Sequence, residues 1–325
     1  MKITVSDDPR ITPLVRELMN KAKANNGTLT IATHNGKFHA DECLCIAMLK
    51  HKLKLLWTGR DDLVINVVRT RNAEKIKSAD IAVDVGDGPY DHHMSITRYA
   101  NGVPYASCGK LLEAIESNKA IINLLLDKSL YAVQLADNGE SSVRYSINYF
   151  SWIGLMNETY KEAMDSDFEN SMFNDALDMV ETIYERLYLV IIELIENRKY
   201  LQNAKFHVGG KIIELPTSRG ISSNFVFKKF KNVCGILNPH ESDGCWTLKW
   251  ISNPNGVTFE NTISFPLEWR SEIGATNGNT QIASKRYTLG CIFCHPSGHM
   301  ASFDTRDHAI SAAIYVMSLD YSAWN

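Results

Sequence analysis

Six histidine and aspartate residues in the first half of the chain carry side chains that bind hard divalent cations. They fall in three short polar segments: His34, His39 and Asp41 in the first, Asp84 and His92 in the second, and Asp137 in the third. A single aspartate in such a place is typical of a turn or a helix cap. Together the six form the donor set of a two-metal site, in which a shared carboxylate holds ions about 3.5–4 Å apart. We predict Asp84 as the shared ligand and phosphoester hydrolysis as the reaction, because such a pair binds phosphate oxygens and activates water.

Strands and helices alternate around these segments. An apolar, β-prone run at residues 28–33 stops at His34, and a helical pattern follows at residues 43–50. Further β-prone runs occupy residues 64–70 and 80–86. This alternation predicts an α/β fold with an open, mainly parallel sheet flanked by helices. Ligands bind beyond the carboxyl ends of such strands, so we expect the sheet to bring the polar segments together.

The second half of the chain divides into a helical part and a β-rich part. Helical spacing of apolar residues covers residues 109–117, 121–137, 148–158 and 171–199. Short β-prone runs follow at residues 211–215, 224–230, 233–237, 247–251, 262–265 and 291–294, with an expected loop at 271–284 and an expected helix at 305–318. We therefore predict two domains, a phosphoesterase domain at residues 1–203 and a smaller, β-rich α+β substrate-binding domain at residues 204–325.

The composition fits a globular protein and limits its partners. The 325 residues carry a formal net charge of −3 at pH 7, which excludes the strongly basic surface of many sequence-independent nucleic-acid binders. A nuclease remains compatible, because bound metal ions restore a positive field where a phosphate would lie. The chain has no apolar run long enough to span a bilayer, and its N-terminal residues are too charged for a signal peptide. We expect a soluble, intracellular protein that does not bind membranes.

The seven cysteines form no regular framework. An odd number is typical of reduced thiols in a reducing compartment. Cys291 and Cys294 form a C-x-x-C pair, which would fit redox chemistry or half of a zinc site, but no second pair lies nearby to complete four zinc ligands. We favour buried, unreactive cysteines.

Longer stretches around the predicted ligands resemble a known family. The residues that carry this resemblance are Thr33–Glu42, Val83–Gly86, Tyr90–His93 with its Asp-His-His, Asp137–Gly139 and, more weakly, Gly290–Phe293 with Ser297 and Gly298. They resemble the melanocyte-proliferating-gene family of metal-dependent exonucleases, within the DHH phosphoesterase superfamily. The resemblance runs from about residue 28 to residue 318, and it implies a DHH-type fold for the N-terminal domain.

The resemblance implies roles for individual residues. His34, His39 and Asp84 would hold one ion, and Asp41, Asp84, His92 and Asp137 the other. His39 stands where the superfamily has an aspartate, and an imidazole suits Mn²⁺ better than Mg²⁺. Two Mn²⁺ ions are therefore the expected cofactors, with Mg²⁺ as the alternative.

Two further residues of this half are candidates for catalysis. With Asp84 and His92, His93 is the third predicted catalytic residue, which would bind phosphate or donate a proton to the leaving oxygen; a structural role is the alternative. Glu42 would fit a general base, but we favour a helix cap.

Two arginines are candidates for phosphate binding. Arg69 and Arg71 follow a predicted strand, and their Val-Arg-Thr-Arg segment resembles that of the family, which implies phosphate contacts. A solvent-facing pair is the alternative.

A second set of candidate substrate contacts lies in the C-terminal half. His295, Ser297, Gly298 and His299 form a predicted turn after a strand, and Arg306 begins a predicted helix whose free N–H groups could hold an anion. The family usually has Gly-Gly-His-Arg-Thr where this chain has Ala301–Thr305, so Phe303 replaces the histidine and Asp304 the basic residue. This departure puts substrate binding by the second domain in question, and His299 is the candidate replacement.

Three functions were compared. The resemblance implies a 3′-to-5′ exonuclease that acts on single-stranded RNA or short oligonucleotides. The alternative is a phosphatase for small molecules such as pyrophosphate, short oligonucleotides or cyclic dinucleotides, which the acidic charge favours. A non-catalytic, metal-binding regulator is the third hypothesis. The presence of all six predicted ligands argues against it, because an enzyme that had lost its activity would be expected to lack at least one of them. The sequence leaves open the native substrate, the compartment and the oligomeric state, a homodimer included.

Overall fold

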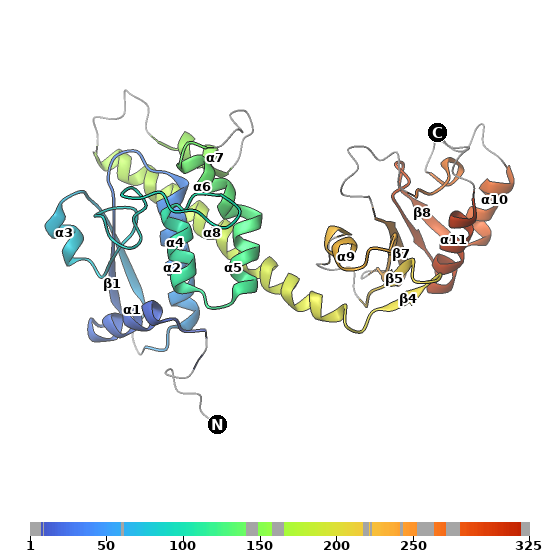
Figure 1. Cartoon of the computed structure of the whole chain (residues 1–325), viewed down its shortest axis with the longest axis horizontal. Coiled ribbons are helices and arrows are strands. Elements are labelled where there is room, and N and C mark those ends of the chain that lie inside the picture. Colours follow the sequence, from blue (N-terminus) through green and yellow to red (C-terminus); the bar gives the residue numbers. More distant parts are fainter. Residues whose placement is uncertain are drawn as a thin grey trace. The chain divides into compact units, whose positions relative to one another are not determined.

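The chain folds into two compact units, seen in a computed structural model (Figure 1). The structure describes residues 8, 10–59, 62–140, 149–157, 166–216, 221, 223–240, 243–251, 263–270 and 280–319. Unit 1 is Met1–Ile192 and unit 2 is Glu193–Asn325. The division falls inside the long helix α8 (Ser166–Tyr200), whereas the sequence predicted a boundary after residue 203.

Unit 1 is built on a parallel sheet, as predicted. Its strands are β1 (Thr28–Thr33), β2 (Val64–Arg69) and β3 (Ile81–Ala82), in the order β2-β1-β3. The central strand β1 buries Leu29, Ile31 and Ala32. Because the three strands run in the same direction, their carboxyl ends lie at one edge of the sheet. The segments that begin at His34 and Asp84 leave the sheet at this edge.

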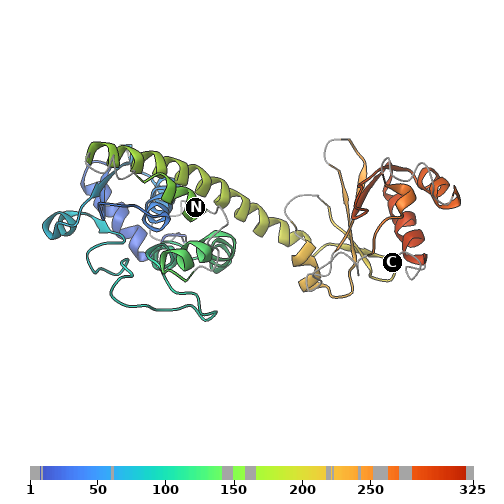
Figure 2. The same ribbon diagram turned by 90° about the horizontal axis from the view of Figure 1, so that it is seen from above.

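Helices surround this sheet. They are α1 (Pro13–Ala24), α2 (Ala40–Leu56), α3 (Ala73–Ser78), α4 (Ser107–Ile115), α5 (Lys119–Leu125), α6 (Tyr131–Asp137), α7 (Tyr149–Leu155) and most of α8. Helix α2 is central, because 13 of its 17 residues are buried. The His51 ring of α2 packs 4.6 Å from the Tyr188 ring of α8, and Figure 2 shows α8 as one continuous helix. Within the described residues, every helix is too short or too polar to cross a membrane.

Helix α6, which ends at Asp137, is placed by two local features. A π-helical turn, η2 (Leu126–Leu130), joins α5 to α6 where the sequence predicted one regular helix at residues 121–137. Such a turn inserts one extra residue and rotates the residues that follow around the helix axis. In addition, α4 approaches α6 closely at Gly109, where a Cβ atom would lie 2.0 Å from the Gln134 Oε1 atom. A larger residue at Gly109 would therefore have to displace the Gln134 side chain of the Asp137 helix.

Unit 2 is a β-rich α+β unit, as predicted. Its mixed sheet has the order β4-β5-β6-β7-β9-β8, formed by β4 (Lys205–His207), β5 (Ile212–Glu214), β6 (Gly235–Pro239), β7 (Trp246–Trp250), β8 (Cys291–Cys294) and β9 (Met300–Phe303). One core includes Ala309 and Ala312 of α11 (Arg306–Ser318), with Ile282 of α10 (Thr280–Thr288) packed against it. A second core includes Val226 of α9 (Ser223–Lys229). A 3₁₀ turn, η4 (Leu267–Trp269), adds the buried Trp269 to the first core.

Further predicted elements differ in the structure. The predicted strand at residues 224–230 is wrong, because this segment forms α9 and buries Val226 in the second core; packing overrides the β preference of its aromatic residues. The predicted strand at residues 80–86 is too long, because Asp84 and Gly86 have φ angles of +54° and +85°, which extended strands do not adopt.

The third difference concerns residues 262–284. Residues 263–265 lie outside the strands, and residue 262 is outside the described residues. Helix α10 begins at Thr280, within the predicted loop, whose residues 271–279 are also outside the described part.

Candidate metal centre

The carboxyl edge of the unit 1 sheet gathers buried acidic and imidazole side chains. His34 directly follows β1, and only 3% of its surface is exposed. Asp84 lies two residues after β3 and is 2% exposed. The His34 Nε2 atom lies 3.4 Å from the Asp84 Oδ2 atom. The two parallel strands therefore place their predicted ligands in contact.

Asp41 connects this edge to two helix N-termini. It lies in the first turn of α2, is fully buried, and accepts hydrogen bonds from the backbone N–H groups of Ser107 and Cys108, both at 2.9 Å. These N–H groups belong to the start of α4, whose N-cap residue, Ala106, has no side-chain hydrogen bond to offer. A carboxylate is favourable there, because it satisfies free N–H groups and faces the positive end of the helix dipole.

Asp84 adopts an unusual backbone conformation that aims its side chain into the site. Its φ angle of +54° is rare for a residue other than glycine, and its N–H donates to the Tyr90 carbonyl at 2.9 Å. The Oδ1 atom accepts from the Ser107 hydroxyl at 2.9 Å and lies 3.2 Å from the His92 Nδ1 atom. Strain of this kind is retained where the surroundings hold the residue in place.

His92, His39 and Asp137 complete the cluster. The His92 Nε2 atom lies 3.1 Å from the Asp137 Oδ2 atom, and the His39 Nδ1 atom lies 3.6 Å from Asp137 Oδ1. His39 is the N-cap of α2 and Asp137 ends α6. All six predicted ligands thus lie in one connected cluster, although they come from the ends of two strands, the start of α2, the loop of His92 and the end of α6.

The cluster contains donor groups whose ligand atoms lie within 4.8 Å of one another. They are His34 with His39, Glu42 and Asp84; Asp41 with His92 and Asp137; and Asp84 with Asp91, His92 and His93. The first matches the first predicted ion position with Glu42 added, whereas the second holds Asp41, His92 and Asp137 of the second position without Asp84, which groups with His92 only in the third. Asp84 belongs to two groups and contacts the imidazoles of both predicted positions. Oxygen and imidazole donors of this kind suit divalent metal ions.

The electrostatics of the cluster also fit cations. Burial raises the pKa of Asp41, and the charges of Asp137 and Asp84 raise it further. Burial acts to lower the pKa of His34, yet hydrogen bonds with Asp84 and Glu42 raise it to about 10. In the same way, hydrogen bonds with Asp137 and Asp84 outweigh burial and raise the pKa of His92 to about 10. The carboxylates thus hold protons on the imidazoles, and divalent cations at the same positions would replace these protons.

Glu42 contributes more to the cluster than the sequence predicted. Its Oε1 atom accepts from the His39 N–H at 2.7 Å, which is the expected helix cap. The same atom lies 3.2 Å from His34 Nε2, and Oε2 has no hydrogen-bond partner among the described residues although Glu42 is fully buried. An unsatisfied buried carboxylate oxygen is costly. Its place beside two imidazoles makes Glu42 a candidate seventh ligand.

Ser107 was missed by the sequence analysis. Its hydroxyl donates to Asp84 Oδ1 and lies 3.1 Å from His92 Nδ1, while its N–H binds Asp41. The only sequence signal was a serine at the start of a helical pattern.

His93 lies at the exposed side of the cluster. Its Nδ1–H donates to Asp91 Oδ1 at 2.6 Å, and Asp91 also accepts from the backbone N–H of Asp87 at 3.0 Å. The His93 ring stacks on His92 with centroids 4.4 Å apart, and 59% of its side chain is exposed. Asp91 therefore orients an imidazole that reaches both the cluster and the solvent.

The predicted phosphate-binding arginines differ in their surroundings. Arg71 is exposed. The Arg69 side chain is only 5% exposed and lies 2.8 Å from Glu169 of α8. Its guanidinium also donates to the Gly36 carbonyl. Arg69 is thus engaged within the chain, and its predicted phosphate contact remains a prediction.

The predicted substrate contacts of the C-terminal half lie in unit 2. The Ser297 hydroxyl lies 2.9 Å from His295 Nδ1 and 2.7 Å from His299 Nδ1. Gly298, which precedes His299, has a φ angle of +69° and allows the chain to turn there. Arg306 at the start of α11 is engaged by Glu214, with Nη2 2.7 Å from Glu214 Oε2. The turn therefore groups two imidazoles and a hydroxyl, while the Arg306 charge is balanced within the chain.

The replacements at residues 303 and 304 have structural roles. Phe303 is fully buried in the first core of unit 2, and Asp304 pairs with His308 at 2.6 Å. Neither side chain takes the place of a substrate-binding histidine or a basic residue.

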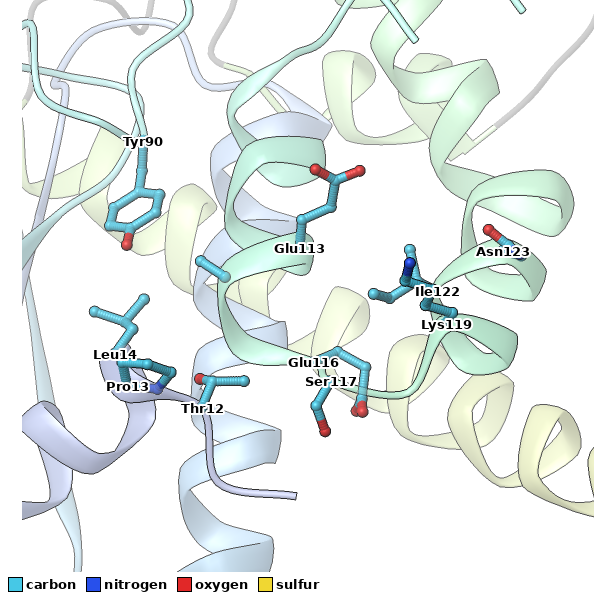
Figure 3. A pocket seen from close by; sticks show the side chains of 11 residues that line it. Thr12, Pro13, Leu14, Tyr90, Glu113, Glu116, Ser117, Lys119, Ile122 and Asn123 are labelled. Atoms are coloured by element: carbon cyan, nitrogen blue, oxygen red, sulfur yellow. The ribbon is translucent and has the colours of Figure 1, made fainter. Parts of the chain in front are cut away.

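A separate cavity of about 750 Å³ opens at the other end of α4 (Figure 3). Thr12, Tyr90, Glu113 and Lys119 are among the residues that line it. No predicted ligand or substrate contact is among these residues, so the cavity does not belong to the metal centre.

Comparisons with known proteins identify relatives that match most of the chain. The chain is 26% identical over 333 residues to a protein named MYG1 protein from Dictyostelium discoideum, covering 89% of this chain and 97% of the relative. It is 27% identical over 336 residues to a human protein named MYG1 exonuclease, covering 87% of this chain and 84% of the relative. A solved structure of RecJ with Mg²⁺ from Thermus thermophilus matches at 14% identity over 95% of this chain and 53% of that chain, with a TM-score of 0.22, which is too low to support an argument.

The family model described as MYG1_exonuc, uncharacterised protein family UPF0160, matches residues 30–317, which include every predicted ligand. The chain therefore belongs to the MYG1_exonuc family, UPF0160.

Proposed function

We propose that this protein is a divalent-metal-dependent phosphodiesterase that removes nucleotides from the 3′ end of single-stranded RNA. One observation carries the hydrolase proposal: Asp84 contacts the imidazoles of two donor groups, which is the arrangement of a two-metal site with a shared carboxylate. The name of the human relative supports an exonuclease. Direction and RNA preference rest on the motif resemblance, and the imidazole-rich donor set favours Mn²⁺.

The residues of the chain divide the chemistry among them. When bound, two divalent ions would supply Lewis acidity toward phosphate oxygens and an activated water. His34, His39, Asp41, Asp84, His92 and Asp137 would hold them, with Glu42 as an additional ligand. His93 is oriented through its Nδ1–H by Asp91, so its Nε2 atom is left free of that contact. In the imidazolium form, Nε2–H would give its proton to the leaving oxygen and leave the neutral imidazole that Asp91 holds through Nδ1–H.

A small-molecule phosphatase is the second candidate. Two of the predicted phosphate-binding arginines, Arg69 and Arg306, are paired with Glu169 and Glu214. The net charge of −3 adds no general attraction for a long polyanion. A small phosphoester would need fewer cationic contacts than an RNA chain.

The test is hydrolysis of a 5′-labelled single-stranded RNA and, in parallel, of pyrophosphate by the purified protein with Mn²⁺, with Mg²⁺ or with chelator. The proposal predicts a descending RNA ladder with Mn²⁺ that Asp84→Asn abolishes. Asp127→Asn is the matched control, because Asp127 is exposed on η2. Phosphate release without RNA cleavage would support the second candidate instead. Inactivity on both substrates with metal bound would contradict both.

A further inference from the structure

The loop that links the first two predicted ligands is held by side chains from distant parts of the sequence. Residues 35–38 connect His34 to His39, and Gly36 in this loop has a φ angle of +86°. The Gly36 N–H donates to Glu169 Oε1 at 2.9 Å, and the Gly36 carbonyl accepts from Arg69. Arg69 also lies 2.8 Å from Glu169. The two side chains therefore bind each other and both backbone polar groups of Gly36.

A second contact holds the same loop two residues later. The Phe38 N–H donates to Asn157 Oδ1 at 2.7 Å, and the Phe38 carbonyl accepts from Asn157 Nδ2 at 2.8 Å. One amide side chain thus satisfies both backbone groups of Phe38. Asn157 follows α7 and Glu169 lies in α8, so neither is near the loop in sequence.

Arg69 is placed for this role and poorly placed for binding a ligand. Its side chain is 5% exposed. The guanidinium lies 4.6 Å from the centre of the Phe173 ring and 5.6 Å from that of Phe38. It also lies 3.2 Å from the Asn170 side-chain oxygen. Aromatic faces and hydrogen-bond acceptors of the chain itself therefore contact the guanidinium, while its buried Nε atom has no hydrogen-bond partner among the described residues.

We propose that Arg69, Asn157 and Glu169 form a loop clamp that positions His34 and His39 for metal binding, and that Arg69 does not contact the substrate. This inference rests on the metal centre proposed above. A glycine-containing loop has many accessible conformations. An ion bound by the imidazoles at both ends of the loop would restrict the loop to one conformation, at an entropic cost. The clamp removes this cost in advance. It is therefore a set of positioning residues that acts through the two histidines.

The clamp predicts a specific defect. Arg69→Ala or Asn157→Ala should leave all ligands in place but weaken Mn²⁺ binding at the His34–His39 position by about 10- to 100-fold, as for other residues that orient metal ligands. Binding at the Asp41–His92–Asp137 position should change less. Hydrolysis should recover in excess Mn²⁺, with KM for the substrate unchanged.

The experiment is titration of the full-length, metal-free protein with Mn²⁺ by calorimetry and by electron paramagnetic resonance. Arg186→Ala and Asn123→Ala are matched controls, since both side chains are exposed. Circular dichroism verifies the fold of each variant. Should Arg69→Ala fail to fold, Arg69→Lys keeps the charge but loses the forked contact, and a smaller loss of Mn²⁺ affinity is expected.

Two results would separate the possible failures. Unchanged Mn²⁺ affinity in folded clamp variants, together with a raised KM for Arg69→Ala, would overturn the clamp and restore Arg69 as a substrate contact. If the wild-type protein does not bind Mn²⁺ or Mg²⁺, the metal centre itself is refuted and the clamp with it.

Discussion

Protons and metal ions should compete for the imidazoles of the metal centre. In the metal-free protein, hydrogen bonds with the surrounding carboxylates outweigh burial and raise the pKa of His34 and of His92 to about 10. We therefore expect both imidazoles to be protonated at neutral pH when no metal ion is bound. A metal ion binds only an unprotonated nitrogen, so each ion must displace one proton from its histidine.

The size of the effect follows from these assignments. One histidine with a raised pKa lies at each of the two predicted ion positions, His34 at the first and His92 at the second. Between pH 6 and 8, which is below both pKa values, the affinity for each ion should rise about tenfold per pH unit. This amounts to about 100-fold per ion, or about 2.7 kcal/mol, over the two units.

Calorimetric titration with Mn²⁺ at pH 7 in buffers of different ionisation enthalpy measures the protons released. We expect about two protons when both positions fill, and about one in His34→Gln, which retains the second position. A release near zero, or an affinity for Mn²⁺ that does not vary between pH 6 and 8, would refute the assignment of protonated imidazoles to the metal positions.

Three further changes test other parts of the site and its support. Ser107→Ala removes the hydroxyl that donates to Asp84 and should weaken Mn²⁺ binding at least about tenfold in the same titration. His93→Gln should lower kcat by about 10²- to 10⁴-fold without changing Mn²⁺ affinity, because His93 is predicted to transfer a proton. Lys52→Met leaves the buried Glu116, 2.8 Å from the Lys52 Nζ atom, without its cation, and urea unfolding should show a loss of about 3–5 kcal/mol.

Each of these expectations has a control and an outcome that counts against it. Ser78→Ala, an exposed serine, should bind Mn²⁺ like the wild type; equal binding in Ser107→Ala would remove Ser107 from the site. An unchanged kcat in His93→Gln would leave His93 a structural role. For the buried pair, Lys52→Met with Glu116→Leu should recover stability, and a double variant less stable than the single one would contradict the reasoning.

The convergence of the ligands was predictable because it follows from sheet geometry. Residues 28–33 were predicted as a strand and form β1 with these bounds. Parallel strands place their carboxyl ends at one edge, so His34 and Asp84 had to approach each other once the strands paired.

Interactions over long sequence separations could not be predicted in this way. Asn157 lies 119 residues after its partner Phe38, and Glu169 lies 133 residues after its partner Gly36. No local sequence pattern marks either residue as a contact of the loop between His34 and His39. The contacts of Arg69 were not predictable either. The family resemblance and its place at the end of a strand suggested a phosphate contact, whereas packing against α8 gives it a partner within the chain. The helix α9 was missed because burial of Val226 decides its structure.

In the proposed metal centre, Asp84 is shared by two metal positions. Anomalous diffraction from crystals of the protein grown with Mn²⁺ would locate these positions. We expect two Mn²⁺ peaks about 3.5–4 Å apart with the Asp84 carboxylate between them, one beside His34 and His39 and the other beside Asp41, His92 and Asp137. A single peak, or peaks that do not share Asp84, would contradict it.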